Sequence, residues 1–161
     1  MAMAHGYAKI EGRPMMALLH GTVGLMHGSM AIYNAYADRV PVYIMAANHQ
    51  DPAGGVNAYH SAQDLGALVR DFVKWDAETL SAEQFAQSAV RAYKIGMTPP
   101  MGPTLVVIDH EMQGEPLSDR SHLRVPKLTM AAPPQGDANA VREAARMLVE
   151  GYFAEMGVKV R

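Results

Sequence analysis

The chain has 161 residues, 49% of them hydrophobic and 19% charged, with a formal net charge of -2 and no cysteine. This length and apolar content suit one domain with a sizeable core. The weak negative charge argues against a nucleic-acid partner, and the lack of cysteine excludes disulfides and thiolate metal sites. The sequence shows neither a signal-peptide pattern nor the roughly 20 apolar residues that span a bilayer. We therefore expect a cytoplasmic protein without a membrane role.

Short apolar runs alternate with segments of helical period through most of the chain. In chain order these segments cover residues 15–19, 25–36, 42–46, 62–69, 81–95 and 104–109. The runs at 15–19, 42–46 and 104–108 are predicted strands, adjacent or nearly so. The last run has no alternating polar residues, which is typical of strands covered by helices on both faces. The pattern predicts an α/β fold with a largely parallel sheet flanked by helices.

The most clearly marked helix begins at Ser81. Ser81 and Gln84 form a capping-box pattern, and apolar residues then recur on one helical face. We expect this helix to end at Gly96, because the proline-rich segment 98–103 cannot continue it and must turn toward the next strand.

The composition changes after Glu115. Residues 116–135 contain four prolines and no long apolar run, which is typical of an extended linker. Asp137 then caps a second amphipathic helix. We predict a first domain over residues 1–115, a linker over 116–136, and over 137–161 the start of a further domain or an unrelated tail.

A glycine-containing turn over residues 19–28 follows the first predicted strand and opens a helix. Glycines let a backbone approach a ligand, and ligands gather at the carboxyl ends of parallel strands. The spacing fits neither a phosphate loop nor a Rossmann motif. The alternative is an ordinary tight turn. The candidate binding residues are Gly21, Thr22, Val23, Gly24 and His27.

Seven histidines are the other candidates, and none of them forms a metal-binding pattern. His110 lies next to Glu111 but has no second histidine at the required spacing, and His122 lies in the predicted linker; no metal site is expected. His20 and His60 border predicted elements whose loops could converge on one cleft. The alternative for each is a surface or core histidine without a catalytic role.

The carboxylates show no pairing at catalytic spacing. We interpret them as solvated ends of secondary-structure elements: Asp71, Asp76, Glu78, Asp109 and Glu111.

Five blocks, in order, resemble the pyrimidine-binding domain of thiamine diphosphate-dependent enzymes of the acetolactate synthase and benzoylformate decarboxylase type. Residues 4–12 are similar to the family's Ala-x-Gly-Tyr-Ala-x-x-x-Gly, and residues 34–41 to its Asp-Ala-Tyr-Ala-Asp-Ser-Val-Pro. Residues 21–27 stand where acetolactate synthases show Ser-Gly-Pro-Gly-Ala-Thr-Asn. Residues 58–62, which begin with Ala58 and Tyr59, and residues 100–106 resemble two further blocks.

The resemblance implies thiamine diphosphate as cofactor and a 2-oxo acid as substrate. In such enzymes the cofactor lies between the pyrimidine domain of one subunit and the diphosphate-binding domain of another. The resemblance also implies that the turn at Gly21, Thr22, Val23, Gly24 and His27 lines the aminopyrimidine pocket. His20 matches a histidine that transfers protons during decarboxylation and product release in benzoylformate decarboxylase-like enzymes. His60 stands where some family members carry a glutamine or histidine that reaches the bound intermediate.

The chain also departs from the family. The family's catalytic glutamate lies upstream of the helix in which this chain begins, and its Mg²⁺ site belongs to a domain that this chain lacks. We therefore expect an N-terminally incomplete domain, inactive alone, with an uncovered sheet edge or apolar face that favours a homo-oligomer. The alternatives are a small subunit that pairs with a separate diphosphate-binding chain, and a non-catalytic interaction domain.

Overall fold

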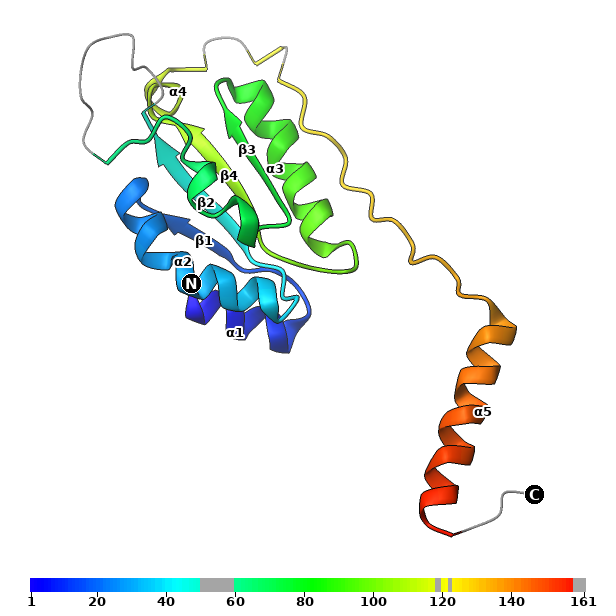
Figure 1. Ribbon diagram of the computed structural model, residues 1–161. Helices are drawn as coiled ribbons and strands as arrows, with labels where there is room; N and C mark the ends of the chain where they lie inside the picture. Colours follow the sequence, from blue (N-terminus) through cyan, green and yellow to red (C-terminus); the bar gives the residue numbers. More distant parts are fainter. Residues whose placement is uncertain (50–59, 118–119, 122, 158–161) are drawn as a thin grey trace. The chain divides into compact units, whose positions relative to one another are not determined.

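Four parallel strands form the centre of the structure, a computed structural model that describes residues 1–49, 60–117, 120–121 and 123–157 (Figure 1). The strands are β1 (Met16–Leu19), β2 (Tyr43–Asn48), β3 (Trp75–Thr79) and β4 (Thr104–Asp109), in the spatial order β1-β2-β4-β3. The predicted α/β fold with a parallel sheet is confirmed, and the three predicted strands are neighbours. Ala58, Tyr59 and His122 lie outside the described residues.

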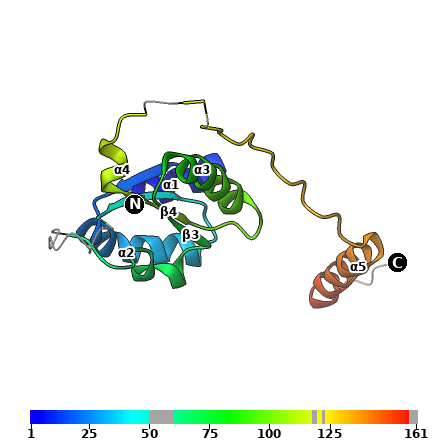
Figure 2. The same ribbon diagram turned by 90° about the horizontal axis from the view of Figure 1, so that it is seen from above.

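Helices cover both faces of the sheet, as the view from above shows (Figure 2). On one face, α2 (Thr22–Ala37) and the short 3₁₀ helices η2 (Gly66–Leu68) and η3 (Arg70–Phe72) enclose the larger core, to which α1 (Ala2–Glu11) adds Ala4. On the other face, α3 (Ala82–Met97) and α4 (His110–Gly114) cover a smaller core around Val106 and Ile108.

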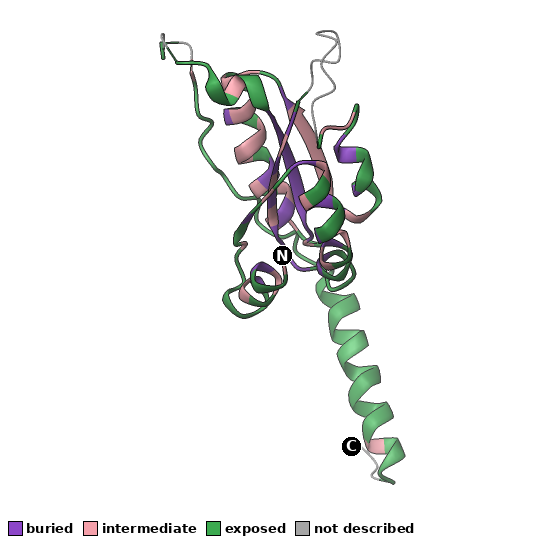
Figure 3. Ribbon diagram, turned by 90° about the vertical axis from the view of Figure 1, so that its left-hand side faces the viewer, coloured by how far each residue is buried: buried purple, intermediate pink, exposed green. Residues whose placement is uncertain are grey.

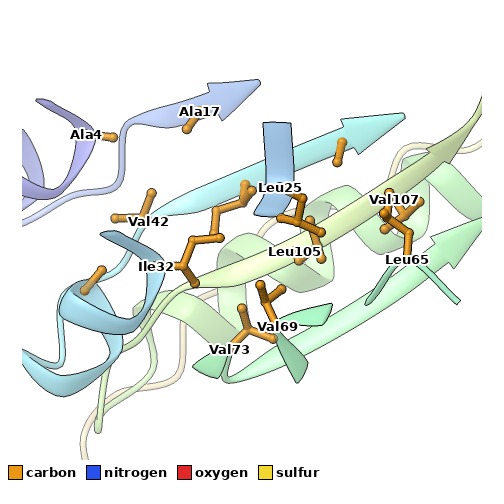
Figure 4. Packing of buried hydrophobic residues seen from close by; sticks show 13 residues of the cluster. Ala4, Ala17, Leu25, Ile32, Val42, Leu65, Val69, Val73, Leu105 and Val107 are labelled. Atoms are coloured by element: carbon orange, nitrogen blue, oxygen red, sulfur yellow. The ribbon is translucent and has the colours of Figure 1, made fainter. Parts of the chain in front are cut away.

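The central position of β4 in the sheet explains why its apolar run contains no alternating polar residues. All six of its residues are buried, because both of its faces are covered and both of its edges are paired (Figure 3). Leu105 and Val107 point into the larger core, where Leu105 lies near Leu25 and Val107 lies near Leu65 (Figure 4). Burial of such side chains contributes about 1.5–3 kcal/mol each.

Helix α3 begins where the sequence indicates but ends one residue later. The Ser81 side chain accepts a hydrogen bond from the Gln84 N–H at 3.2 Å, as in a capping box. The predicted end at Gly96 is wrong, because α3 continues to Met97. Gly96 serves close packing instead, since its carbonyl accepts the Gly102 N–H at 3.2 Å as the following segment turns back.

Residues 62–69 were expected to form a helix, and this prediction is wrong. They form turns followed by η2, because side chains from elsewhere bind their backbone. Asn48 donates to the Ala62 carbonyl at 2.8 Å and accepts the Ala62 N–H at 3.1 Å. Glu78 accepts the Leu65 N–H at 3.1 Å.

Strand β3 is an element that the sequence analysis did not predict. It contains Asp76 and Glu78, so it lacks an apolar run, yet it pairs in parallel with β4. The interpretation of these acids as solvated ends is wrong. Arg70 contacts Asp76 at 2.9 Å and Asp64 at 2.8 Å, and burial raises the pKa of Glu78 above its ordinary value.

The same interpretation also fails for Asp109. It is buried at the end of β4 and caps α4, because its Oδ1 accepts the N–H groups of Glu111 and Met112 at 2.9 and 3.1 Å.

Strand β1 has one covered face and one exposed face. Ala17 belongs to the larger core, whereas Met16 and Leu18 on the opposite face are 60% and 72% exposed. Among the described residues β1 pairs only with β2, so its second edge is available for pairing. Self-association through this region stays a prediction.

The chain divides into two units, Met1–Ala131 and Ala132–Arg161. The second unit contains α5 (Ala138–Glu155), whose predicted cap is confirmed, since Asp137 accepts the N–H groups of Asn139 and Ala140 at 2.9 and 2.8 Å. The predicted domain limits at residues 115 and 136 stay predictions. Within the described residues, no helix combines the length and apolar character needed to cross a membrane.

The turn from β1 into α2 depends on a close backbone approach at Gly21. A Cβ atom on Gly21 would lie 2.7 Å from the carbonyl oxygens of both Ala47 and His60. Only glycine fits between these two carbonyls without a shift of the backbone. The next residue, Thr22, donates its N–H to the His60 carbonyl at 2.9 Å. Gly21 therefore holds the β1 turn, the end of β2 and the His60 loop together.

We predict that Gly21→Ala destabilises the protein by at least about 1–3 kcal/mol, as overpacking of a filled site does. Gly6→Ala is the matched control. No atom lies within 4 Å of a Cβ at Gly6, which is inside α1, so alanine there should be neutral or stabilising. Chemical denaturation of both variants measures the difference, and equal stabilities would contradict the steric role of Gly21.

Candidate functional site

The candidate site lies at the carboxyl edge of the sheet. His20 directly follows β1, and Gly21 leads into α2, so the first turn of α2 faces this edge. The contacts of Gly21 and Thr22 with the His60 carbonyl bring the loop before η2 to the same place. Parallel strands all end at one edge, which is why residues far apart in sequence meet there.

His20 and His60 meet at this edge. Their ring centroids are 5.0 Å apart and the ring planes are nearly perpendicular, at 73°. His60 has a positive φ of 66°, an uncommon backbone conformation for a residue other than glycine. The structure thus brings together the two histidines that the sequence singled out, while their catalytic roles stay predictions.

An open pocket of about 980 Å³ adjoins the two histidines. Its walls are mostly apolar and combine the end of β1, the first half of α2 and the start of α1, a composition typical of small-molecule sites. The lining residues are Met1, Leu19, His20, Val23, Gly24, Met26, His27, Gly28, Ala31 and His60.

The predicted binding residues fall into two groups. Val23, Gly24 and His27 line the pocket, while their role in binding stays a prediction. Gly21 and Thr22 do not line it and instead shape the turn beneath it. Gly21 is buried, and the Oγ1 atom of Thr22 is buried without a hydrogen-bond partner among the described residues.

Several lining residues were not singled out from the sequence. Gly28 and Ala31 share a helical face with Gly24 and His27, since their spacing is three, four and seven residues from Gly24. That spacing is a signal that could have identified them. Leu19 was assigned only to the strand, and nothing in the sequence indicates that Met1 reaches the pocket.

The chemistry of the pocket is limited to imidazole and backbone groups on apolar walls. None of its lining residues is an acid. In the described part of the chain, no group of three or more histidine, aspartate or glutamate side chains could hold a metal ion. The arrangement suits a flat, mostly apolar ring with the three histidines His20, His27 and His60 at its border.

A family model matches the part of the chain that builds this pocket. Residues 1–68 match the thiamine pyrophosphate enzyme N-terminal TPP binding domain. The match includes α1, β1, α2 and β2, together with all lining residues of the pocket.

Curated proteins are also similar to this chain. A probable 2-ketoarginine decarboxylase of Pseudomonas aeruginosa is 34% identical over 95 residues, which is 58% of this chain and 17% of that protein. The mitochondrial acetolactate synthase catalytic subunit of Saccharomyces cerevisiae is 28% identical over 104 residues, 65% of this chain and 15% of that protein. The chain thus spans only about a sixth of the length of these relatives.

Solved structures share the fold. A putative thiamin diphosphate-dependent enzyme from Mycobacterium smegmatis superposes with a TM-score of 0.66 and 26% identity, covering 91% of this chain and 27% of the other. Benzoylformate decarboxylase from Polynucleobacter necessarius gives a TM-score of 0.71 with 21% identity and the same coverages, a likeness of fold. Residues 1–68 therefore match an N-terminal TPP binding domain of thiamine pyrophosphate enzymes, and the chain is similar in sequence to part of an acetolactate synthase and shares its fold with part of a benzoylformate decarboxylase.

Proposed function

We propose that the chain supplies the aminopyrimidine half of a thiamine diphosphate site in a 2-oxo-acid decarboxylase or carboligase. The observation that supports this most is the apolar pocket at the carboxyl edge of the sheet, bordered by His20 and His60. The family to which residues 1–68 belong binds this cofactor. When bound, the cofactor supplies an electron sink for cleavage of a bond next to the carbonyl of a 2-oxo acid.

The lining of the pocket fits an aminopyrimidine ring. Leu19, Val23 and Met26 offer apolar surface to the faces of a flat ring, and Gly24 lets the backbone of α2 approach it. His27 would contact the ring border. Gly21 and Thr22 would act indirectly, because they fix the turn on which Val23 and Gly24 lie.

His20 and His60 are proposed to hold and move protons at the open side of the pocket. An imidazole can both donate and accept a proton near neutral pH, which suits a group that serves decarboxylation and product release. The two rings meet edge to face, so a proton carried by one can be stabilised by the other.

The proposed site needs a second domain. No lining residue provides a carboxylate for the pyrimidine ring, and no described cluster could hold the Mg²⁺ that accompanies a diphosphate. We therefore propose that a diphosphate-binding domain of a partner subunit completes the site, within an oligomer. The isolated chain would then bind the cofactor weakly and would not turn substrate over.

The pocket can be tested by binding. Val23→Asp should weaken thiamine diphosphate binding by about tenfold or more, because an unpaired carboxylate would face the ring. The fold should persist, since Val23 is half-exposed in the first turn of α2, where an acid is favourable.

The matched control for this binding test is Val125→Asp, at an exposed position outside the pocket. Titration monitored by NMR measures both affinities. Unchanged binding by the Val23 variant would reject the pocket as the cofactor site.

A second test concerns turnover by the isolated chain. With thiamine diphosphate, Mg²⁺ and a 2-oxo acid such as pyruvate, the chain should release CO₂ no faster than a protein-free blank. The reason is the lack of an acid in the lining and of a metal-binding cluster among the described residues. Turnover above the blank would show that this chain alone forms a complete site.

The third test concerns His20. In an active assembly that contains this chain, His20→Ala should lower turnover by about 10²- to 10⁴-fold, the usual contribution of one positioned acid or base. The melting temperature should barely change. His110→Ala serves as control because His110 is exposed and outside the pocket. A destabilised His20 variant with normal turnover per folded molecule would instead indicate a structural role.

A further inference from the structure

A second pair of histidines lies at the same edge of the sheet, outside the pocket. His49 follows β2 and His110 follows β4, and the last register pair of these strands is Asn48 with Asp109. The next position on each strand therefore places the two imidazoles side by side. Their ring centroids are 4.1 Å apart with an angle of 37° between the planes, and both residues are exposed.

The backbone beneath each imidazole is held in place by a buried polar residue. Asn48 is 1% exposed and forms two hydrogen bonds with Ala62. Asp109 is 9% exposed and caps α4 through the N–H groups of Glu111 and Met112. The backbone positions of the two histidines are thus fixed, so only their side chains need to be ordered when they bind a common ligand.

We propose that His49 and His110 together bind a divalent transition-metal ion such as Zn²⁺ or Ni²⁺. Imidazole nitrogens are preferred ligands of these ions and bind Zn²⁺ at about 2.0–2.1 Å. When two imidazoles bind one tetrahedral ion, each ring centre lies about 3 Å from the ion and the two centres lie about 5 Å apart. The observed separation of 4.1 Å is smaller, so binding requires rotation of one or both rings. Both side chains are exposed and can turn their nitrogens toward one ion.

This is a site of two protein ligands, with water in the remaining coordination positions. No group of three or more candidate ligand residues occurs among the described residues, so an exchangeable ion is expected rather than a closed structural site. No local sequence pattern indicates this site, because the two ligands are distant in sequence. Only the pairing of β2 with β4 brings them together.

His20 and His60 form the competing site, with a ring separation of 5.0 Å. They line the pocket, whereas His49 and His110 do not. The metal site is therefore independent of the proposed function, and the two pairs can be distinguished by single substitutions.

Calorimetric titration of the full chain with ZnCl₂ tests the proposal. One ion should bind per chain, and His49→Ala and His110→Ala should each lower the affinity by about tenfold or more, since even outer-shell changes cost about 10- to 100-fold. His20→Ala, which removes a histidine but leaves this pair intact, should bind as the unmodified protein does. Unchanged binding by the His49 and His110 variants, or loss of binding in His20→Ala, would overturn the proposal.

A second measurement needs no variant. Paramagnetic Ni²⁺ should broaden the backbone NMR signals of Asn48 and Asp109 before those of Leu19 and Gly24. Broadening that begins at Leu19 and Gly24 would place the ion at the His20 pair and contradict the proposal. Circular dichroism checks that His49→Ala and His110→Ala remain folded, as expected for exposed side chains.

Discussion

The parallel pairing of β1, β2 and β4 is the constraint on which the rest of the structure depends. Because the three strands run in one direction, their carboxyl ends meet at one edge of the sheet. Each of these strands is followed directly by a histidine. His20 follows β1, His49 follows Asn48 at the end of β2, and His110 follows Asp109 at the end of β4. The register places His49 beside His110, whereas His20 stands level with Ala47 and meets His60 instead.

The edge is held together by polar contacts to backbone groups rather than by ligands. Gly21 admits the carbonyls of Ala47 and His60, and Asn48 binds both backbone groups of Ala62. These contacts fix the loop before η2 against the ends of β1 and β2. Buried polar groups that are fully paired in this way specify one arrangement, because any alternative leaves a donor or acceptor unsatisfied. These contacts therefore help to shape the pocket beside His20 and His60.

The apolar character of the pocket also bears on its chemistry. Leu19, Val23 and Met26 can enclose a flat ring, but no acid lies among the lining residues. In the proposed site, a ring held on such walls would be oriented rather than activated, and the groups that complete the site would come from another domain. This agrees with the small share of the relatives' length that the chain spans. It also explains why a proton-transfer role for His20 can be measured only in a complete assembly.

The sequence by itself determined the α/β class, three of the strands, the starts of α3 and α5, and the turn that leads into α2. These features depend on local signals: apolar runs, capping residues such as Ser81 and Asp137, and glycines in a turn. It also identified His20 and His60 as candidates, by their places beside predicted elements and by the family resemblance. Local patterns were sufficient for the strands, the helix starts and the turn, because residues close together in the sequence determine these features.

Only the tertiary structure decided the remaining features. Strand β3 carries Asp76 and Glu78, and its pairing with β4 becomes favourable because Arg70 and the Leu65 N–H satisfy these acids. Residues 62–69 leave the helical conformation because Asn48 and Glu78 bind their backbone from distant strands. The meeting of His49 with His110 depends on the register of β2 and β4. In each case the interaction joins residues far apart in the chain, so no local pattern records it.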